Sequence, residues 1–152
     1  MRESERIAAL FHAFYEGECW IGLNFKQAIQ GIDAEKAAHK ASAETNSICQ
    51  LVNHLIYWRK TVIIRLQGVL GHPPMNDFYQ PNQLDATSWK ETLMHFEEVH
   101  QALLQAIHHF DERRLNEPSP MKGQSYYQLM MGCLQHDGYH MGQIVLLKKE
   151  RA

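Results

Sequence analysis

Two histidines one helical turn apart carry the clearest chemical signal in this sequence. In residues 125–149 apolar side chains recur every three or four positions, and His136 and His140 occupy two successive positions of that stripe. Side chains at positions i and i+4 of a helix begin about 5–6 Å apart, so both imidazoles can ligate one ion, as the H-x-x-x-H pattern does for zinc and similar metals. Without a metal, two buried histidines would each need a hydrogen-bond partner in the core, and that interpretation stays open.

A third histidine lies on the second helical segment of the chain. His54 follows Leu51 by three residues and precedes Trp58 by four, which places it on or at the edge of a buried stripe. Alone, it would be interpreted as a core histidine. Three imidazoles from two helices leave coordination positions open, which is the layout of a catalytic rather than a closed structural metal site. We therefore expect His54, His136 and His140 to hold one divalent ion.

Several residues near these histidines could line or support such a site. Gln143 lies on the same side as His140, where it could hydrogen-bond a ligating imidazole or a bound water. Tyr57 and Tyr139 each follow a proposed ligand by three residues, so they could line the pocket or pack as ordinary aromatics. Cys133, one turn before the histidine pair, is interpreted as a small core residue.

A second metal chemistry, that of a di-iron carboxylate site, does not fit the sequence. His100 lies on the apolar stripe of the third helix, where it could line the pocket or hold a ligand in place, and Glu97-x-x-His100 resembles half of a di-iron signature. Residues 47–69 contain no carboxylate, and the fourth helix offers only Asp137 ahead of His140, so the di-iron interpretation fails on ligand count. Asp137 is turned about 100° from the preceding histidine, and we expect it to orient a neighbouring helix or a ligand rather than to act as a base.

Long helices must position these residues, because the helical period runs through most of the chain and no useful stretch alternates with period two. The predicted helices span about residues 4–30, 47–69, 87–114 and 125–149, the last beginning at Ser125. We predict an all-α four-helix bundle with two longer connections, and one domain over residues 1–152.

Individual residues suggest where these helices begin and which faces they bury. Asp33 could cap one or two helical turns in the polar stretch after the first helix, and Thr87 or Ser88 could cap the third helix. Leu10 and Trp20 fall on the predicted apolar stripe of the first helix, so we expect both to be buried.

Composition restricts the class of protein. The 152 residues carry 15 Lys and Arg against 17 Asp and Glu, so no basic surface for nucleic acid is indicated. No segment reaches about 18 uninterrupted apolar residues, and no signal peptide is recognised. The three cysteines are far apart and form no C-x-x-C pair, which favours reduced thiols. We expect a soluble, cytoplasmic protein that contacts neither membrane nor nucleic acid.

The segments around the three histidines resemble the DinB/YfiT-like superfamily of four-helix-bundle metalloproteins. The resemblance covers nearly the whole chain, and its strongest parts are SICQLVNHLIYWR around His54 and LQHDGYHMGQIVLLKK around His136 and His140. A central tryptophan in the first helix and Trp89 near the start of the third add to it. The most specific element is H-D-x-Y-H-x-G-Q-I, which begins at His136.

This resemblance implies a ligand set and a range of activities. The ligand triad of the family maps onto His54, His136 and His140, and implies a divalent metal, zinc or nickel first and iron or manganese next, with water completing its shell. Family members often form homodimers. Some are transferases or isomerases that use a low-molecular-weight thiol such as bacillithiol, mycothiol or glutathione, and others are described as metal-dependent hydrolases or as damage-inducible proteins of unknown role.

A three-histidine ion could activate either a bound thiol or a bound water on behalf of a small-molecule substrate. Hydrolysis would need a nearby base, and residues 47–69 supply none, so we favour thiol S-transfer over a hydrolase. Two other hypotheses stay open: a non-enzymatic, stress-related metal- or ligand-binding bundle, and a bundle in which the histidines are only polar core groups.

Overall fold

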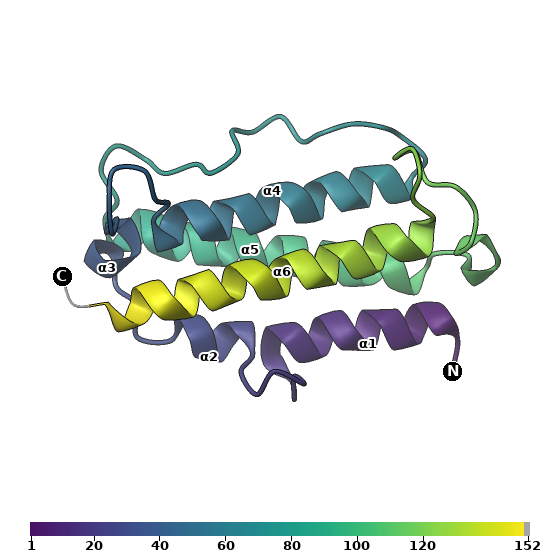
Figure 1. The fold of residues 1–152 in the computed structure, drawn as a ribbon, viewed down its shortest axis with the longest axis horizontal. Coiled ribbons are helices and arrows are strands. Elements are labelled where there is room, and N and C mark those ends of the chain that lie inside the picture. Colours follow the sequence, from purple (N-terminus) through teal and green to yellow (C-terminus); the bar gives the residue numbers. More distant parts are fainter. Residues whose placement is uncertain (151–152) are drawn as a thin grey trace.

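The computed structural model describes residues 1–150 and is all-α, with no β-strand in that part of the chain (Figure 1). Its helices are α1 (Glu3–Glu16), α2 (Phe25–Ile29), α3 (Ala34–Ala38), α4 (Ile48–Leu66), α5 (Ala86–His108), the short 3-10 helix η1 (Glu112–Arg114) and α6 (Tyr126–Lys149). Four of them, α1, α4, α5 and α6, form the four-helix bundle that the sequence predicts.

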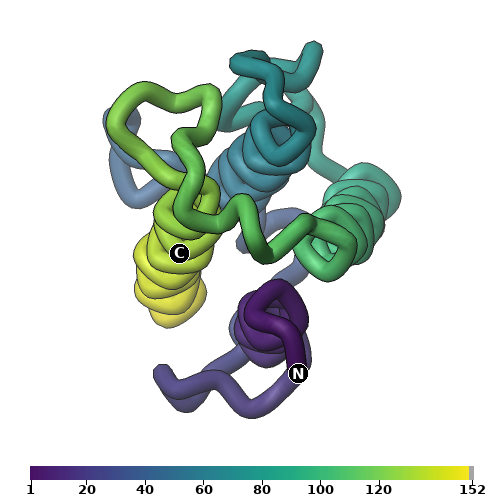
Figure 2. The backbone as a smooth tube through the Cα atoms, turned by 90° about the vertical axis from the view of Figure 1, so that its right-hand side faces the viewer, coloured from purple at the N-terminus to yellow at the C-terminus, as the bar shows by residue number. Residues whose placement is uncertain are grey.

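The view along the bundle in Figure 2 shows how these four helices surround a common core. α4 packs against both α5 and α6, and α1 contacts the other sides of α5 and α6. Aromatic and branched side chains from all four helices fill the space between them, among them Phe11, Leu55, Phe96, Leu103 and Ile144. The two helices that carry the histidine pattern, α4 and α6, therefore lie side by side along their length.

The connection between α4 and α5 has to return along α4, because these two helices run in the same direction (Figure 1). Residues 67–85 make this return as an irregular segment on the outside of α4. Gly68 adopts a φ of 86°, a left-handed conformation that favours glycine, directly after the last turn of α4. The segment therefore passes over α4, and its Asp77 contacts His54 in the first half of that helix.

The first helix is shorter than predicted. α1 ends at Glu16, Gly17 takes an extended conformation, and a new helix begins at Phe25, capped by the side chain of Asn24. The Asn24 amide also donates to the Gly17 carbonyl, which closes the intervening loop. Trp20 lies in that loop and is 100% exposed, so its predicted place on a buried stripe is wrong.

Leu10 is also more exposed than predicted, at 48%, although its neighbours Ile7 and Phe11 are buried. The third helix begins earlier than expected, since Asp85 rather than Thr87 or Ser88 accepts the N-cap hydrogen bond. This helix ends at His108, and the turn that follows is the separate η1.

Other boundaries agree with the sequence. Ser47, Ser125 and Asp33 each cap a helix through a side-chain oxygen that accepts a backbone N–H three residues on, as N-cap residues do. Cys19, Cys49 and Cys133 are all free thiols. No helix within residues 1–150 is both long and apolar enough to cross a bilayer.

Candidate metal centre

His54 of α4 and His136 and His140 of α6 meet at the contact between the two helices. One ligand atom from each ring can be chosen so that all three lie within 4.8 Å of one another. The ring centroids of His136 and His140 are 4.4 Å apart, and the His54 centroid lies 4.9 Å from that of His136 and 4.5 Å from that of His140. The fold therefore brings together the three imidazoles that the sequence pattern singled out.

Contacts on the far side of the His54 ring define which nitrogen faces the cluster. His54 Nδ1 lies 2.6 Å from Asp77 Oδ1 in the connection between α4 and α5. A carboxylate accepts hydrogen bonds, so this contact assigns the ring proton to Nδ1 and leaves a lone pair on Nε2. That Nε2 atom lies 3.0 Å from Nε2 of His136.

Asp77 is itself held in place by the backbone. The same Oδ1 atom accepts the N–H of Phe78 at 2.8 Å, and the Phe78 ring stacks on His54 with 3.8 Å between centroids and 10° between planes. Phe78 has a φ of 50°, a left-handed conformation that costs a non-glycine residue roughly 1–2 kcal/mol. The contacts to Asp77 and His54 therefore hold a strained turn over the imidazole.

His140 is oriented in a similar way within α6. Its Nδ1 lies 2.6 Å from the side-chain oxygen of Gln143 one turn further on. The amide oxygen is an acceptor, so His140 also carries its proton on Nδ1 and directs the Nε2 lone pair away from Gln143. In His136, Nδ1 is buried and has no hydrogen-bond partner among residues 1–150, while Nε2 faces His54.

This donor set fits a divalent cation. The Nε2 lone pairs of His54 and His140 are directed into the cluster by acceptors behind each ring. A single proton on His136 could satisfy only one of these two lone pairs, whereas one cation can be ligated by all three rings. Carboxylate or carbonyl groups that accept the distal N–H are the usual support of metal-ligating histidines.

Burial favours the neutral form of two of these rings. Desolvation lowers the pKa of His54, although Asp77 opposes the shift. Desolvation also lowers the pKa of His136 to about 4, helped by its two histidine neighbours. Neutral imidazole is the form that ligates metals, so both rings are ready to ligate near neutral pH.

Asp137 and His100 both contact Arg59 inside the bundle and are not part of the three-histidine cluster. Asp137 Oδ2 accepts hydrogen bonds from Nε and Nη2 of Arg59 at 3.1 and 2.8 Å. Asp137, Arg59 and His100 are each 0% exposed. His100 Nδ1 lies 3.0 Å from Nη1 of the same guanidinium. Asp137 thus joins α6 to α4, and His100 joins this ion pair to α5.

The remaining sequence candidates lie around the edge of the cluster. Tyr139 is 67% exposed and places its ring edge-on, 4.9 Å from the His140 ring. Tyr57 is half-buried and stacks on His72 rather than on a histidine of the cluster. Cys133 is buried, and burial raises the pKa of its thiol well above the usual value, so it is held in the protonated form.

A cavity of about 490 Å³ opens beside the cluster between α4 and the first half of α6. His54 and His136 line one part of it, and Trp58, Val62 and Leu129 supply apolar walls. Arg65 also faces this space. None of the residues that line it is acidic, so the cavity can accept a small molecule next to the imidazoles without a carboxylate in its wall.

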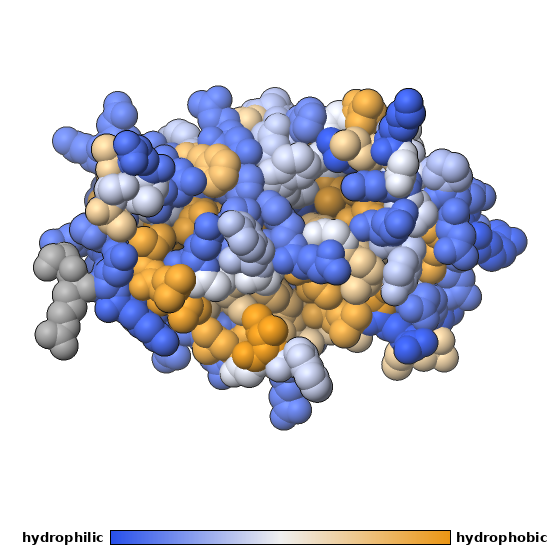
Figure 3. Space-filling model, viewed as in Figure 1, coloured by the Kyte–Doolittle hydropathy of each residue, from blue (hydrophilic) through white to orange (hydrophobic). Residues whose placement is uncertain are grey.

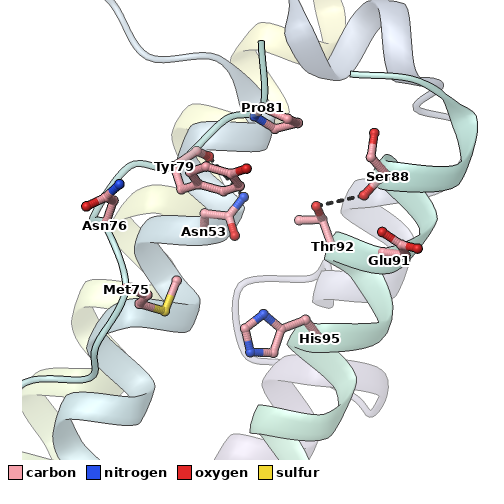
Figure 4. A pocket seen from close by; sticks show the side chains of 9 residues that line it. All are labelled: Asn53, Met75, Asn76, Tyr79, Pro81, Ser88, Glu91, Thr92 and His95. Atoms are coloured by element: carbon pink, nitrogen blue, oxygen red, sulfur yellow. Dashed lines mark hydrogen bonds between the residues drawn. The ribbon is translucent and has the colours of Figure 1, made fainter. Parts of the chain in front are cut away.

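A second cavity, of about 460 Å³, lies between the 67–85 segment and α5 (Figure 4). The close view shows Met75 and Tyr79 of that segment facing Thr92 and His95 of α5. Asn53 of α4 donates to the Tyr79 carbonyl at 3.0 Å. Asn53 directly precedes His54, so this contact attaches the 67–85 segment to α4 next to a proposed ligand. The cavity therefore borders the segment that carries Asp77 and Phe78, and none of the three imidazoles lines it.

Sequence reasoning missed three residues that shape the centre. Asp77 and Phe78 lie in an irregular segment whose path over α4 no periodicity describes. Arg59 had a signal, since it is four residues after Leu55 and three before Val62 on the stripe of α4. A charged residue at such a position needs a buried partner, and Asp137 is that partner.

A helical bundle with three convergent histidines on adjacent helices defines the class of protein. Residues 24–144 match the family model of the DinB superfamily. This range covers most of the chain, including all three histidines, and the chain therefore belongs to the DinB superfamily. Neither the curated proteins nor the solved structures contain a match to the chain.

Proposed function

We propose that this protein is a metal-dependent enzyme with one divalent ion at His54, His136 and His140, and that it activates a low-molecular-weight thiol for S-transfer to a small electrophile. The observation that carries the proposal is the pair of Nε2 lone pairs aimed into the cluster, one backed by Asp77 and one by Gln143. The cavity beside them provides the space for a substrate.

Zinc and nickel are the ions that three imidazoles with open positions suit best. When bound, such an ion keeps its positive charge among neutral ligands and lowers the pKa of a coordinated thiol or water. The chain's own contribution is orientation. Asp77 and Gln143 fix the two ring tautomers, and Phe78 covers the face of His54.

Among the described residues, none that lines the cavity is a carboxylate, and this favours a thiol over water as the activated group. Oδ1 of Asp77 is engaged by His54 and by the Phe78 amide, and Asp77 is not among the residues that line the cavity. The Cys133 thiol in the cavity wall is held protonated by burial. Hydrolysis would need a proton acceptor other than these two groups, whereas a thiol coordinated as thiolate is already the nucleophile.

Elemental analysis and a thiol assay test this proposal together. Wild-type protein, His54→Ala and His12→Ala would be purified without added chelator, with exposed His12 as the control. We expect about one equivalent of metal in wild type and in His12→Ala, and its loss in His54→Ala. Conversion of electrophiles such as epoxides or alkyl halides by cellular thiols should follow the metal content.

The outcomes separate the hypotheses. Metal without turnover by any thiol would contradict the enzyme proposal and favour a non-enzymatic metal-binding protein. Full thiol-dependent activity in His54→Ala would contradict the metal site. Wild-type protein that never binds zinc or nickel would leave the histidines as polar core groups.

We also propose that the protein forms a homodimer through the outward face of α6. Tyr139 and Leu146 on this face are 67% and 69% exposed, and a side chain added at Gly142 between them would meet nothing within 4 Å. Figure 3 shows hydrophobic residues gathered over α6 and toward α1 and α2. Small and apolar side chains allow two helices to approach closely, which supports a second copy as the partner.

A further inference from the structure

Arg65 is a buried arginine that has no hydrogen-bond or ion-pair partner among the described residues. It lies in the last turn of α4, is 6% exposed, and its Nε atom is buried without a hydrogen bond. Within residues 1–150 its side chain forms no hydrogen bond or ion pair, and the only interaction of its guanidinium is with the face of Trp58, 5.6 Å from the ring centroid. A guanidinium carries its charge at any pH at which proteins fold, so burial without an anion is unfavourable.

Arg59, the other buried arginine of α4, has a structural role and serves as a comparison for Arg65. Arg59 is 0% exposed, and its guanidinium is paired with Asp137 and hydrogen-bonded to His100. Its charge is compensated entirely within the protein. Arg65 has no such compensation among the described residues, although it lines a cavity large enough for a small molecule. This difference indicates that the anion for Arg65 comes from outside the chain.

The position of Arg65 relates it directly to the candidate metal centre. It lies eleven residues after His54, which is almost a whole number of helical turns, so both residues occupy one face of α4 at about 16 Å along the axis. Side chains of a helix lean toward its N-terminus, so the guanidinium reaches back toward His54. Trp58 and Val62 lie between them on the same face and line the same cavity.

We propose that Arg65 recognises a carboxylate on the small molecule that this cavity binds, with the reacting end of that molecule at the three histidines. The inference rests on the proposed function and specifies its substrate class: an acidic low-molecular-weight compound, either the thiol or its electrophile. The apolar walls fit the stem of such a molecule, and the fork of the guanidinium matches a carboxylate.

A single carboxylate fits better than a phosphate. Within the described part of the chain, Arg65 is the only side chain in the cavity wall that carries a charge, because burial favours the neutral form of His54 and His136. One carboxylate brings one negative charge, which the guanidinium balances. A phosphate dianion would bring a second charge into a cavity with apolar walls and without a second cationic side chain there.

Two matched probes test the inference by isothermal titration calorimetry on zinc-loaded protein. 6-Mercaptohexanoate and 6-mercaptohexan-1-ol share a thiol and an apolar stem and differ in the terminal carboxylate. We expect wild type to bind the carboxylate about tenfold or more tightly than the alcohol, as a charge-assisted hydrogen bond provides. Arg65→Gln should reduce this ratio to about one without changing the affinity for the alcohol or the zinc content.

Control variants address folding and charge. Arg113→Gln removes an arginine whose side chain is 87% exposed, and it should keep the wild-type ratio. Arg65→Lys retains the charge but not the fork, so it should keep part of the preference. If Arg65→Gln does not fold, the comparison of the two probes on wild type still decides: equal affinities would overturn the inference. A preference that persists in folded Arg65→Gln would also overturn it.

A last arm separates this inference from the proposed function. Hexanoate, which has no thiol, would be titrated into chelator-treated, metal-free protein. Binding that is lost in Arg65→Gln supports the carboxylate site even if the protein never binds zinc or a thiol. Zinc and thiol binding without a preference for the carboxylate would overturn the role of Arg65 and leave the proposed function standing.

Discussion

The guanidinium of Arg59 and the carboxylate of Asp137 form an ion pair that is completely buried and joins α4 to α6. Two hydrogen bonds of 2.8 and 3.1 Å connect them, and Asp137 directly follows His136 in the chain. The two helices that supply the proposed ligands are therefore held together by charge as well as by apolar packing. A buried charge that loses its partner is much more unfavourable than the pair is favourable.

Replacing Asp137 should therefore destabilise the protein strongly. We expect Asp137→Asn to lower the free energy of unfolding by about 3–5 kcal/mol, because Arg59 is left buried without a counter-charge. Urea denaturation of metal-free protein followed by circular dichroism measures this. Asp111→Asn, which breaks an exposed pair with Arg113, should change the midpoint little. An unchanged midpoint in Asp137→Asn would contradict the assigned role of the pair.

Replacing Asp77 should weaken metal binding with little effect on the fold. Asp77→Asn removes the negative charge behind His54 and no longer fixes the proton on Nδ1, so zinc affinity should fall about 10–100-fold. Competition with a chromophoric chelator measures the affinity. Asn76→Ala changes the exposed neighbour and should bind zinc as wild type does. Equal affinities for all three proteins would show that the carboxylate does not support the ligand.

The stability of the metal-free protein should fall in acid because of His100. Burial, aided by Arg59, lowers the pKa of this histidine to about 3, while in the unfolded chain it titrates near 6.5. Between these values the unfolded chain binds a proton that the folded protein does not, so the free energy of unfolding decreases by up to about 1.4 kcal/mol per pH unit as the pH falls from 6.5 toward 3.

His100→Gln tests this assignment because it cannot titrate. Urea midpoints at pH 7 and pH 4.5 should differ less in the variant than in wild type, because the carboxylates and the other histidines whose pKa is lowered by burial, among them His54 and His136, titrate in both proteins. His109→Gln, at an exposed position, serves as the control and should keep the wild-type difference. If His100→Gln loses as much stability in acid as wild type, the acid sensitivity arises elsewhere.

A charge on the outward face of α6 should disrupt the proposed homodimer. Leu146→Glu places a carboxylate at a position that is 69% exposed in the single chain, so it should shift the sedimentation coefficient toward the monomer without lowering the thermal midpoint of the fold. Val69→Glu, at an exposed apolar residue after α4, should leave the dimer intact. Wild-type protein that sediments as a monomer at all concentrations would contradict the proposal.

Much of the fold could be predicted from the sequence because the information is local. The start of α6 follows from the cap at Ser125, and the proximity of His136 and His140 follows from the helical period alone. The break after α1 also had a local signal that the apolar spacing obscured. Asn24 and Gln27 form a capping box that starts a new helix, and Gly17 precedes it.

The support of the candidate site could not be predicted because it is not local. Asp77 contacts His54 across 23 residues of sequence, and only the path of the 67–85 segment brings them together. The contrast between Arg59 and Arg65 is equally invisible in the sequence. Both lie on the buried side of one helix, and only the surroundings show that one has an internal counter-charge and the other faces a cavity.

The single Asp77 oxygen that serves both the His54 ring and the Phe78 amide has a further consequence. A ligand that holds the His54 ring in place should also stabilise the strained turn at Phe78, because both depend on the same Asp77 oxygen. By thermodynamic linkage, stabilising the turn should in the same way favour ligand binding at His54. A cation at the histidines should therefore slow amide hydrogen exchange in the connection between α4 and α5. That connection also borders the second cavity (Figure 4), so the slower exchange should extend to Met75 and Tyr79 in the wall of that cavity.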